Sequence, residues 1–166
     1  MPATWTPSSG KRRRCWGEAM PSNGLIELID KHTEGLTQAA FKDLLMNPRT
    51  PAFRGVPREQ AAGRVTALYR SLARWLADHD DDAVRAAHED WGRTRFDQRI
   101  PISEIVYGVL VAKGHLRQYA RDHGLAELQT LEPAIGEFFD RALYYLVRGY
   151  EMRAASPPPS GRGPQA

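Results

Sequence analysis

The sequence predicts an all-α protein, one helical bundle of five or more helices. Apolar residues recur at intervals of about three, four and seven in five segments, which is the spacing of the buried face of an amphipathic helix. No stretch alternates apolar and polar residues between turn signals, as a strand would. With 166 residues, the chain has the length of one domain.

Composition divides the chain into a central domain and two tails. Residues 1–21 hold three prolines and the basic run Lys11–Arg14, and residues 154–166 hold four prolines among small and polar residues. Neither stretch has enough apolar surface to offset the entropy lost on ordering. We therefore expect disordered tails on either side of a folded domain over residues 22–153.

The first helix is expected over residues 23–46. Ser22 can cap its N-terminus, and Pro48 ends it because a proline disfavours helical backbone in the residue before it. Phe53, in the proline-rich loop that follows, is expected to dock on the body. The second helix is expected over residues 57–78, since a proline suits the first turn.

The third helix is expected over residues 81–97. The run Asp80–Asp82 places negative charge at its positive N-terminal end, and it lacks the glycine and the later glutamate of a calcium-binding loop. The apolar stripe of this helix ends on a charged residue, Arg95. We expect Arg95 to pair with a carboxylate, with Glu104 as a candidate partner, or with helix-end carbonyls.

The fourth helix is expected over residues 102–123, after a break at Pro101 and before Gly124, which suits the end of a helix. Within it, residues 105–112 are apolar almost all round. A helix of that kind is buried on more than one side, so we expect this helix to lie inside the bundle or against a partner.

The last helix is expected over residues 131–153, with Thr130 as its cap and Pro133 in its first turn. Its apolar residues cover more than one face, whereas a small bundle covers one face of each helix. Surplus apolar surface usually marks a partner site. We therefore expect a homodimer, with the interface formed by Phe138, Phe139, Tyr145 and Leu146.

The order of residues between 90 and 116 is the most specific feature of the chain. A tryptophan, a glycine and an arginine are followed by a proline, an isoleucine and a glutamate, and then by an apolar run; these residues are Trp91, Gly92, Arg95, Pro101, Ile102 and Glu104. This order resembles the N-terminal sensor domain of the RsbRD family, the non-haem globin-like domains of bacterial stressosome proteins. The resemblance covers about residues 25–151.

The resemblance implies a globin-like helical bundle that acts as a homodimer and passes a signal to a regulatory partner protein. Stressosome proteins carry the phosphorylated serine or threonine in a C-terminal STAS domain, and no such segment follows the last expected helix here. We therefore expect a stand-alone sensor or adaptor with no cofactor. We do not expect an enzyme, because no nucleophile-elbow or phosphate-loop motif occurs and the single cysteine, Cys15, lies in the tail.

A sensor that binds haem or another small ligand is the first alternative. Haem iron needs an axial ligand and a large apolar cavity, and His88 and His115 share stripes with inward-facing residues. However, Trp91, Phe138 and Phe139 would fill such a space. A phosphotransfer role for His88 would need an exposed imidazole and an ATP-binding segment, and neither is expected.

The distribution of charge argues against nucleic acid as the main partner. The formal net charge is +3, of which residues 1–20 contribute +3 and residues 153–166 contribute +2, so the middle carries −2. A nucleic-acid module usually has its basic patch on the domain itself. A nucleic-acid-binding adaptor that uses Lys11–Arg14 is the second alternative.

The sequence contains no signal peptide and no transmembrane run, so we expect a cytoplasmic protein without membrane contact.

Overall fold

The structure is a computed structural model that describes residues 23–156. Within that range the chain forms five α-helices and one short 3-10 helix: α1 (Asn23–Met46), η1 (Pro51–Gly55), α2 (Arg58–Asp78), α3 (Asp81–Asp97), α4 (Ile102–Asp122) and α5 (Leu128–Ala155). No residue of this range lies in a strand, so the all-α prediction is confirmed. Ser22, Cys15, the run Lys11–Arg14 and most of both expected tails lie outside the described residues.

The ends of α1 to α4 agree with the predicted ends to within one residue. Capping residues and prolines determine these ends, and both can be recognised in the sequence. The carboxylate of Asp80 accepts a hydrogen bond from the backbone N–H of Ala83 at 3.0 Å and caps α3. Pro57 and Pro101 occupy the N-cap positions of α2 and α4. At the end of α2, His79 adopts the left-handed conformation with φ 51°.

α5 differs from its prediction at both ends. It begins at Leu128, three residues early, so Thr130 lies inside the helix and is not its cap. Pro133 therefore falls in the second turn, where its missing N–H leaves the carbonyl of Gln129 without its usual helical donor. Leu128 and Leu131 are both buried, and their burial favours the extra turn. At the other end the helix continues to Ala155, two residues past the prediction.

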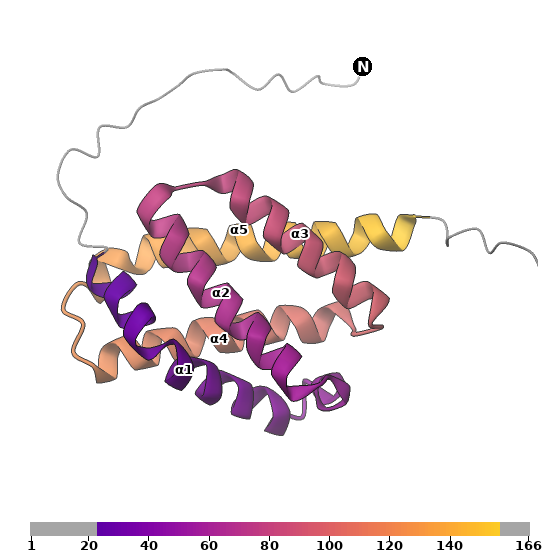
Figure 1. The fold of residues 1–166 in the computed structure, drawn as a ribbon, viewed down its shortest axis with the longest axis horizontal. Helices are drawn as coiled ribbons and strands as arrows, with labels where there is room; N and C mark the ends of the chain where they lie inside the picture. Colours follow the sequence, from indigo (N-terminus) through magenta and orange to yellow (C-terminus); the bar gives the residue numbers. More distant parts are fainter. Residues whose placement is uncertain (1–22, 157–166) are drawn as a thin grey trace, which may run out of the picture.

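The helices pack in a compact arrangement in which α5 spans the length of the body (Figure 1). α3 packs along α5, α4 lies between α1 and α5, and α2 crosses α1 on the face toward the viewer. No helix in residues 23–156 is long and apolar enough to cross a membrane.

The core lies where α2, α4 and α5 meet. Tyr69 is completely buried, and its hydroxyl donates to the carbonyl oxygen of Ala112 at 2.9 Å. Burial raises the pKa of Tyr69, so the hydroxyl keeps the proton that it donates. Phe138 and Phe139 of α5 pack edge to face with ring centres 5.4 Å apart, and Trp75 of α2 lies 5.9 Å from the ring of Phe138.

α3 and α5 touch backbone to backbone at two glycines. A Cβ atom at Gly92 would overlap the carbonyl oxygen of Leu146 and would lie 2.7 Å from the backbone nitrogen of Tyr150. A Cβ atom at Gly149 would lie 2.6 Å from the Cα atom of Glu89. Only residues without a side chain permit so close a crossing, which explains why the glycine follows the tryptophan in α3.

The connection between α1 and α2 is fixed to the body by three contacts. Phe53 of η1 is 4% exposed, so its predicted docking is confirmed. The hydroxyl of Thr50 donates to the carbonyl oxygen of Leu44 at 2.6 Å, which satisfies one of the carbonyls left open at the end of α1. On the other side, the backbone N–H of Ala52 donates to the carboxylate of Glu104 at 2.8 Å.

Candidate functional site

Arg95, the charged residue at the end of the apolar stripe of α3, is buried in the middle of the fold. Arg95 is only 1% exposed. Its guanidinium carbon lies 5.6 Å from the ring centre of Phe53 and 6.0 Å from that of Trp91. Aromatic faces attract a cation, but they do not satisfy its N–H groups in the way that oxygen acceptors would.

Arg95 has one hydrogen-bond partner among the described residues. Its Nη1 donates to the side-chain oxygen of Gln98 at 2.8 Å, whereas its Nε and Nη2 atoms are buried without a partner. Burial, with a smaller contribution from Arg64, lowers the pKa of Arg95 to about 10. The guanidinium is therefore still charged at neutral pH, and a buried cation with open donors is costly because it has lost the water that would bind it.

A small cavity adjoins this guanidinium, and we call it the Arg95 cavity. Its volume is about 10 Å³, room for roughly one water-sized group. It is lined by Arg64 and Arg95 and by apolar side chains of α1, η1, α2, α3 and α4, with no acidic residue among them. Trp91 also lines it, and its indole N–H is buried without a partner. The cavity thus combines apolar walls with unpaired hydrogen-bond donors.

The predicted pairing of Arg95 with Glu104 is wrong. Glu104 lies in the first turn of α4, and its carboxylate is taken by the backbone N–H of Ala52. That N–H opens a 3-10 helix and has no partner within it, so it needs an external acceptor. Arg95 bonds no helix-end carbonyl either, since its one hydrogen bond goes to the side chain of Gln98.

The residues that carry the family resemblance serve several roles and do not form one cluster. Trp91 and Arg95 line the cavity, whereas Gly92 faces α5 at the helix crossing. Pro101 is exposed at the N-cap of α4 and Ile102 is half-buried beside it. Arg64 lines the same cavity from α2 and was not anticipated, because nothing in the sequence sets it apart from the other arginines of that helix.

The two histidines considered as haem ligands have other partners. His88 is 2% exposed, and its Nδ1 lies 2.8 Å from the carbonyl oxygen of Val84. Burial lowers the pKa of His88, an effect that this hydrogen bond partly offsets. His115 is half-buried and reaches across from α4 to α1, where its Nε2 lies 3.1 Å from the carboxylate of Asp43.

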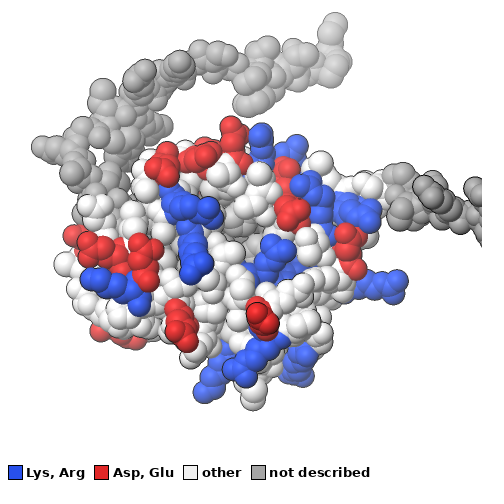
Figure 2. Space-filling model, viewed as in Figure 1, with Lys and Arg blue, Asp and Glu red and all other residues white. Residues whose placement is uncertain are grey.

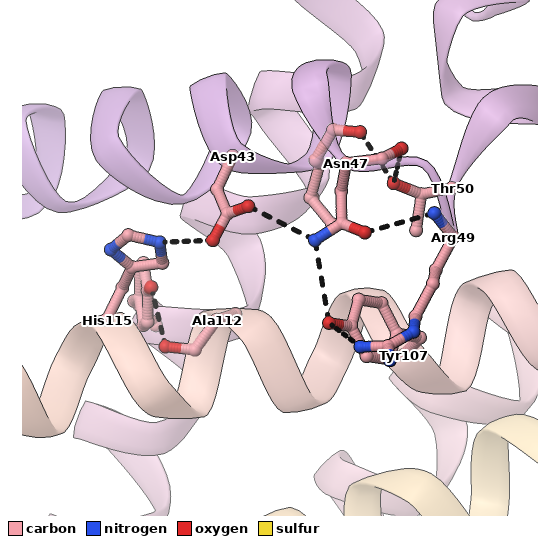
Figure 3. A network of polar contacts seen from close by, with 9 residues as sticks. Asp43, Asn47, Arg49, Thr50, Tyr107, Ala112 and His115 are labelled. Carbon is pink, nitrogen blue, oxygen red and sulfur yellow. Dashed lines mark hydrogen bonds and ion pairs between the residues drawn. The ribbon is translucent and has the colours of Figure 1, made fainter.

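Asp43 begins a chain of polar contacts along the seam between α1 and α4 (Figure 3). Its other oxygen accepts from the side-chain amide of Asn47 at 3.3 Å. The hydroxyl of Tyr107 accepts from Arg49 at 3.2 Å and from Asn47 at 3.5 Å, and these donors lower the pKa of Tyr107. The seam ties the end of α1 to α4, and each group in it has a structural partner.

Three of the four residues expected at a dimer interface fill the core of the protomer. Phe138, Phe139 and Leu146 are 0% exposed, so that placement of the interface is wrong for them. Tyr145 is half-buried and packs against the core. The sequence could not separate these positions from surface ones because α5 packs against α3 on one side and α4 on another.

Apolar surface remains exposed where α4 and α5 lie side by side. Leu110 of α4 is 46% exposed and Tyr144 of α5 is 63% exposed. The ion pairs Arg117–Glu132 and Lys113–Asp140 fix the antiparallel register of the two helices. One turn further along, this register brings Leu110 level with Tyr144. We call this the α4–α5 strip.

Comparison with known proteins identifies the fold class. No protein-family model matches the chain, and no curated protein matches it. Among solved structures, the all-α fold is similar to that of the sporulation inhibitor pXO2-61 from Bacillus anthracis, with a TM-score of 0.64 over 79% of this chain and 98% of that one. The two sequences are 21% identical, so the likeness shows a shared fold.

Proposed function

We propose that this chain is a non-enzymatic bacterial regulatory domain, similar to the N-terminal sensor domain of the RsbRD family. It would adopt a globin-like bundle, act as a homodimer in the cytoplasm and pass a signal to a partner protein. The fold likeness to a sporulation inhibitor supports a regulatory role. The resemblance of the stretch from Trp91 to Glu104 supports the family, and Arg95 supports a sensing function.

The observation that carries the proposal is the pair of open donors on Arg95. An isolated buried cation destabilises a fold by several kcal/mol unless something compensates it. The donors Nε and Nη2 are free to bind an acceptor in the Arg95 cavity. A planar guanidinium suits a small planar anion, which it can hold through two parallel hydrogen bonds. Such an anion is larger than the one-water volume of the cavity, so its entry would displace side chains that line the cavity. Occupation of the cavity would then be the sensed event.

Thermal unfolding with added nitrate or formate, at constant ionic strength, tests this sensing function. A ligand that binds only the folded state raises the melting temperature as its concentration exceeds the dissociation constant. We expect that rise for the natural chain and not for Arg95→Met. Arg121→Met, at an exposed arginine of α4, is the matched control and should respond like the natural chain. Equal responses in all three proteins would contradict the proposal.

The α4–α5 strip supports the homodimer. Leu110 and Tyr144 expose apolar surface in register on neighbouring helices, and such surface usually marks a partner site. We expect light scattering to give a dimeric mass for the full chain and a monomeric mass for the double variant Leu110→Glu, Tyr144→Glu. Met46, which is 75% exposed at the end of α1, provides the control: Met46→Glu should remain dimeric. A monomeric natural chain at micromolar concentration would exclude the dimer.

A further inference from the structure

Charge is distributed unevenly over the described part of the chain. Residues 42–74 contain seven Lys or Arg and two Asp or Glu, a net charge of +5. The other described residues contain eleven basic and seventeen acidic residues, a net charge of −6. The near-neutral body therefore contains a strongly basic segment, which the net charge of −2 over residues 21–152 does not reveal.

The basic residues of this segment also differ from the others in their partners. Outside it, most exposed arginines face carboxylates at short distances, as in the pairs Arg117–Glu132 at 2.6 Å, Arg141–Asp81 at 2.5 Å and Arg153–Asp97 at 2.8 Å. Within residues 23–156, no ion pair involves a Lys or Arg of residues 42–74. The positive charge of the segment is therefore not neutralised by the fold.

Five of the exposed cations form what we call the basic face: Lys42, Arg54, Arg58, Arg70 and Arg74. Arg54 is tied to the end of α1, where its Nε donates to the carbonyl oxygen of Leu45 at 3.1 Å, and the guanidinium of Arg58 lies 5.8 Å from the ring of Phe41. Arg70 and Arg74 are exposed one turn apart on α2. Figure 2 shows blue side chains over α2 and below it, with red ones among them, on the left of the view and at the upper rim near the α2–α3 connection.

The remaining surface of α2 favours a phosphate backbone over a protein or a membrane. Its other exposed residues include the small or polar Gln60, Gly63 and Ala67, with one acid near each end, Glu59 and Asp78. A Cβ atom at Gly63 would meet nothing within 4 Å. Protein interfaces have an aromatic or aliphatic centre, and membrane-bound helices need an apolar face. The large exposed apolar side chains of α4 and α5 lie elsewhere, and Met46 alone borders the basic face.

We propose that the basic face binds the phosphate backbone of double-stranded nucleic acid without reading its sequence. Arg70 and Arg74 are four residues apart on one side of α2, an axial rise of about 6 Å, which matches roughly two steps of a duplex strand at 3.4 Å each. Guanidinium groups bind phosphate oxygens through paired hydrogen bonds. Small residues between the arginines let the phosphate backbone approach α2 closely. This function is separate from ligand sensing and from the α4–α5 strip.

Fluorescence anisotropy of a labelled 30-base-pair DNA duplex with the full chain tests the proposal. Each phosphate contact contributes about −0.9 to the slope of log K against log[salt]. The double variant Arg70→Glu, Arg74→Glu should therefore bind more weakly and lose about 2 from the magnitude of that slope. The control Arg85→Glu, Arg121→Glu makes the same change in net charge on α3 and α4 and should keep the slope of the natural chain. Circular dichroism of each variant verifies the fold.

Four outcomes would overturn the proposal. The first is no duplex binding at low salt. The second is an equal loss of slope in both double variants, which would indicate net charge alone. The third is complete loss of binding when Lys11 to Arg14 are replaced by alanine, with no effect of Arg70→Glu, Arg74→Glu. The fourth is binding to vesicles containing phosphatidylserine or to polyglutamate without duplex binding, which would assign the face to a membrane or to an acidic protein.

Discussion

Gly92 of α3 and Gly149 of α5 are the two halves of one backbone crossing, since each lies where any side chain would collide with the main chain of the other helix. Their roles are reciprocal: Gly92 meets the turn that holds Leu146 and Tyr150, and Gly149 meets Glu89. This crossing sets the distance between the two helices that make the most extensive contact in the fold.

Replacing either glycine by alanine should therefore be strongly destabilising. A methyl group against main-chain atoms cannot be accommodated by a rotamer change, so Gly92→Ala or Gly149→Ala should cost about 3 kcal/mol or more of unfolding free energy, the upper end for overpacking. Gly63→Ala in α2 is the control, because open space surrounds that position. It should stabilise the protein by up to about 1 kcal/mol. Urea denaturation measures all three, and a neutral Gly92→Ala would refute the crossing.

Arg95 should reduce the stability of the ligand-free protein. Methionine keeps much of the apolar contact with Phe53 and Trp91 and removes the uncompensated charge, so Arg95→Met should raise the free energy of unfolding by about 1–3 kcal/mol. Chemical denaturation in a buffer without small planar anions measures the effect. A large loss of stability in Arg95→Met would show instead that the guanidinium has compensating partners and that its burial is favourable.

His88 should make the fold sensitive to mild acid. Its folded-state pKa is lowered from the usual 6.5 because burial disfavours the charged imidazolium. Below pH 6.5 the unfolded chain binds a proton that the folded chain does not, so the stability associated with neutral His88 is present above pH 6.5 and is lost as the pH falls through the folded-state pKa. Stability measured from pH 7.5 to pH 5 should fall less steeply in His88→Phe than in the natural chain. The half-exposed His32 gives the control: stability in His32→Phe should fall with pH as steeply as in the natural chain, because His88 is unchanged.

Glu104 should hold the α1–α2 connection closed. Glu104→Val removes the acceptor of the part-buried Ala52 N–H, and an unsatisfied donor there should cost up to about 1 kcal/mol, the low end of the range for buried donors. We expect faster tryptic cleavage at Arg49 or Arg54, both exposed near η1. Glu104→Gln keeps an acceptor oxygen and should protect the connection better than valine does. If valine and glutamine give the same cleavage rate as the natural chain, the contact does not hold the connection.

Local signals in the sequence predicted most of the fold. Proline at 48, 57 and 101 and the acids at 80–82 act within a turn of where they stand, so the ends of α1 to α4 followed from them. The start of α5 did not, because burial of Leu128 depends on helices that are distant in sequence. The same limit applies to Arg95: periodicity showed that it faces inward, but its neighbours come from α2, η1 and α4.

The dimer surface shows the other limit of periodicity. An apolar residue on a helix with several packed sides can face either the core or a partner, so Phe138 and Tyr144 cannot be ranked from sequence alone. Leu110 belongs to the run 105–112, which is apolar almost all round. That pattern indicated that part of this helix faces a partner or lies inside the bundle, but it did not single out Leu110. The helix crossing at Gly149 could not be predicted from sequence, because a glycine inside a helix can be present for several different reasons.

Trp91 makes the Arg95 cavity visible to spectroscopy. Its indole lies 6.0 Å from the guanidinium carbon of Arg95, and its ring centre lies 6.0 Å from that of His88. An anion entering beside the guanidinium, or a proton arriving on the imidazole, would change the electric field across that indole. The emission wavelength and intensity of Trp91 would then report both events without any attached dye. With Trp75→Phe and with Trp5 and Trp16 also replaced, Trp91 would be the one remaining tryptophan of the four. All tryptophan fluorescence would then come from the wall of the Arg95 cavity.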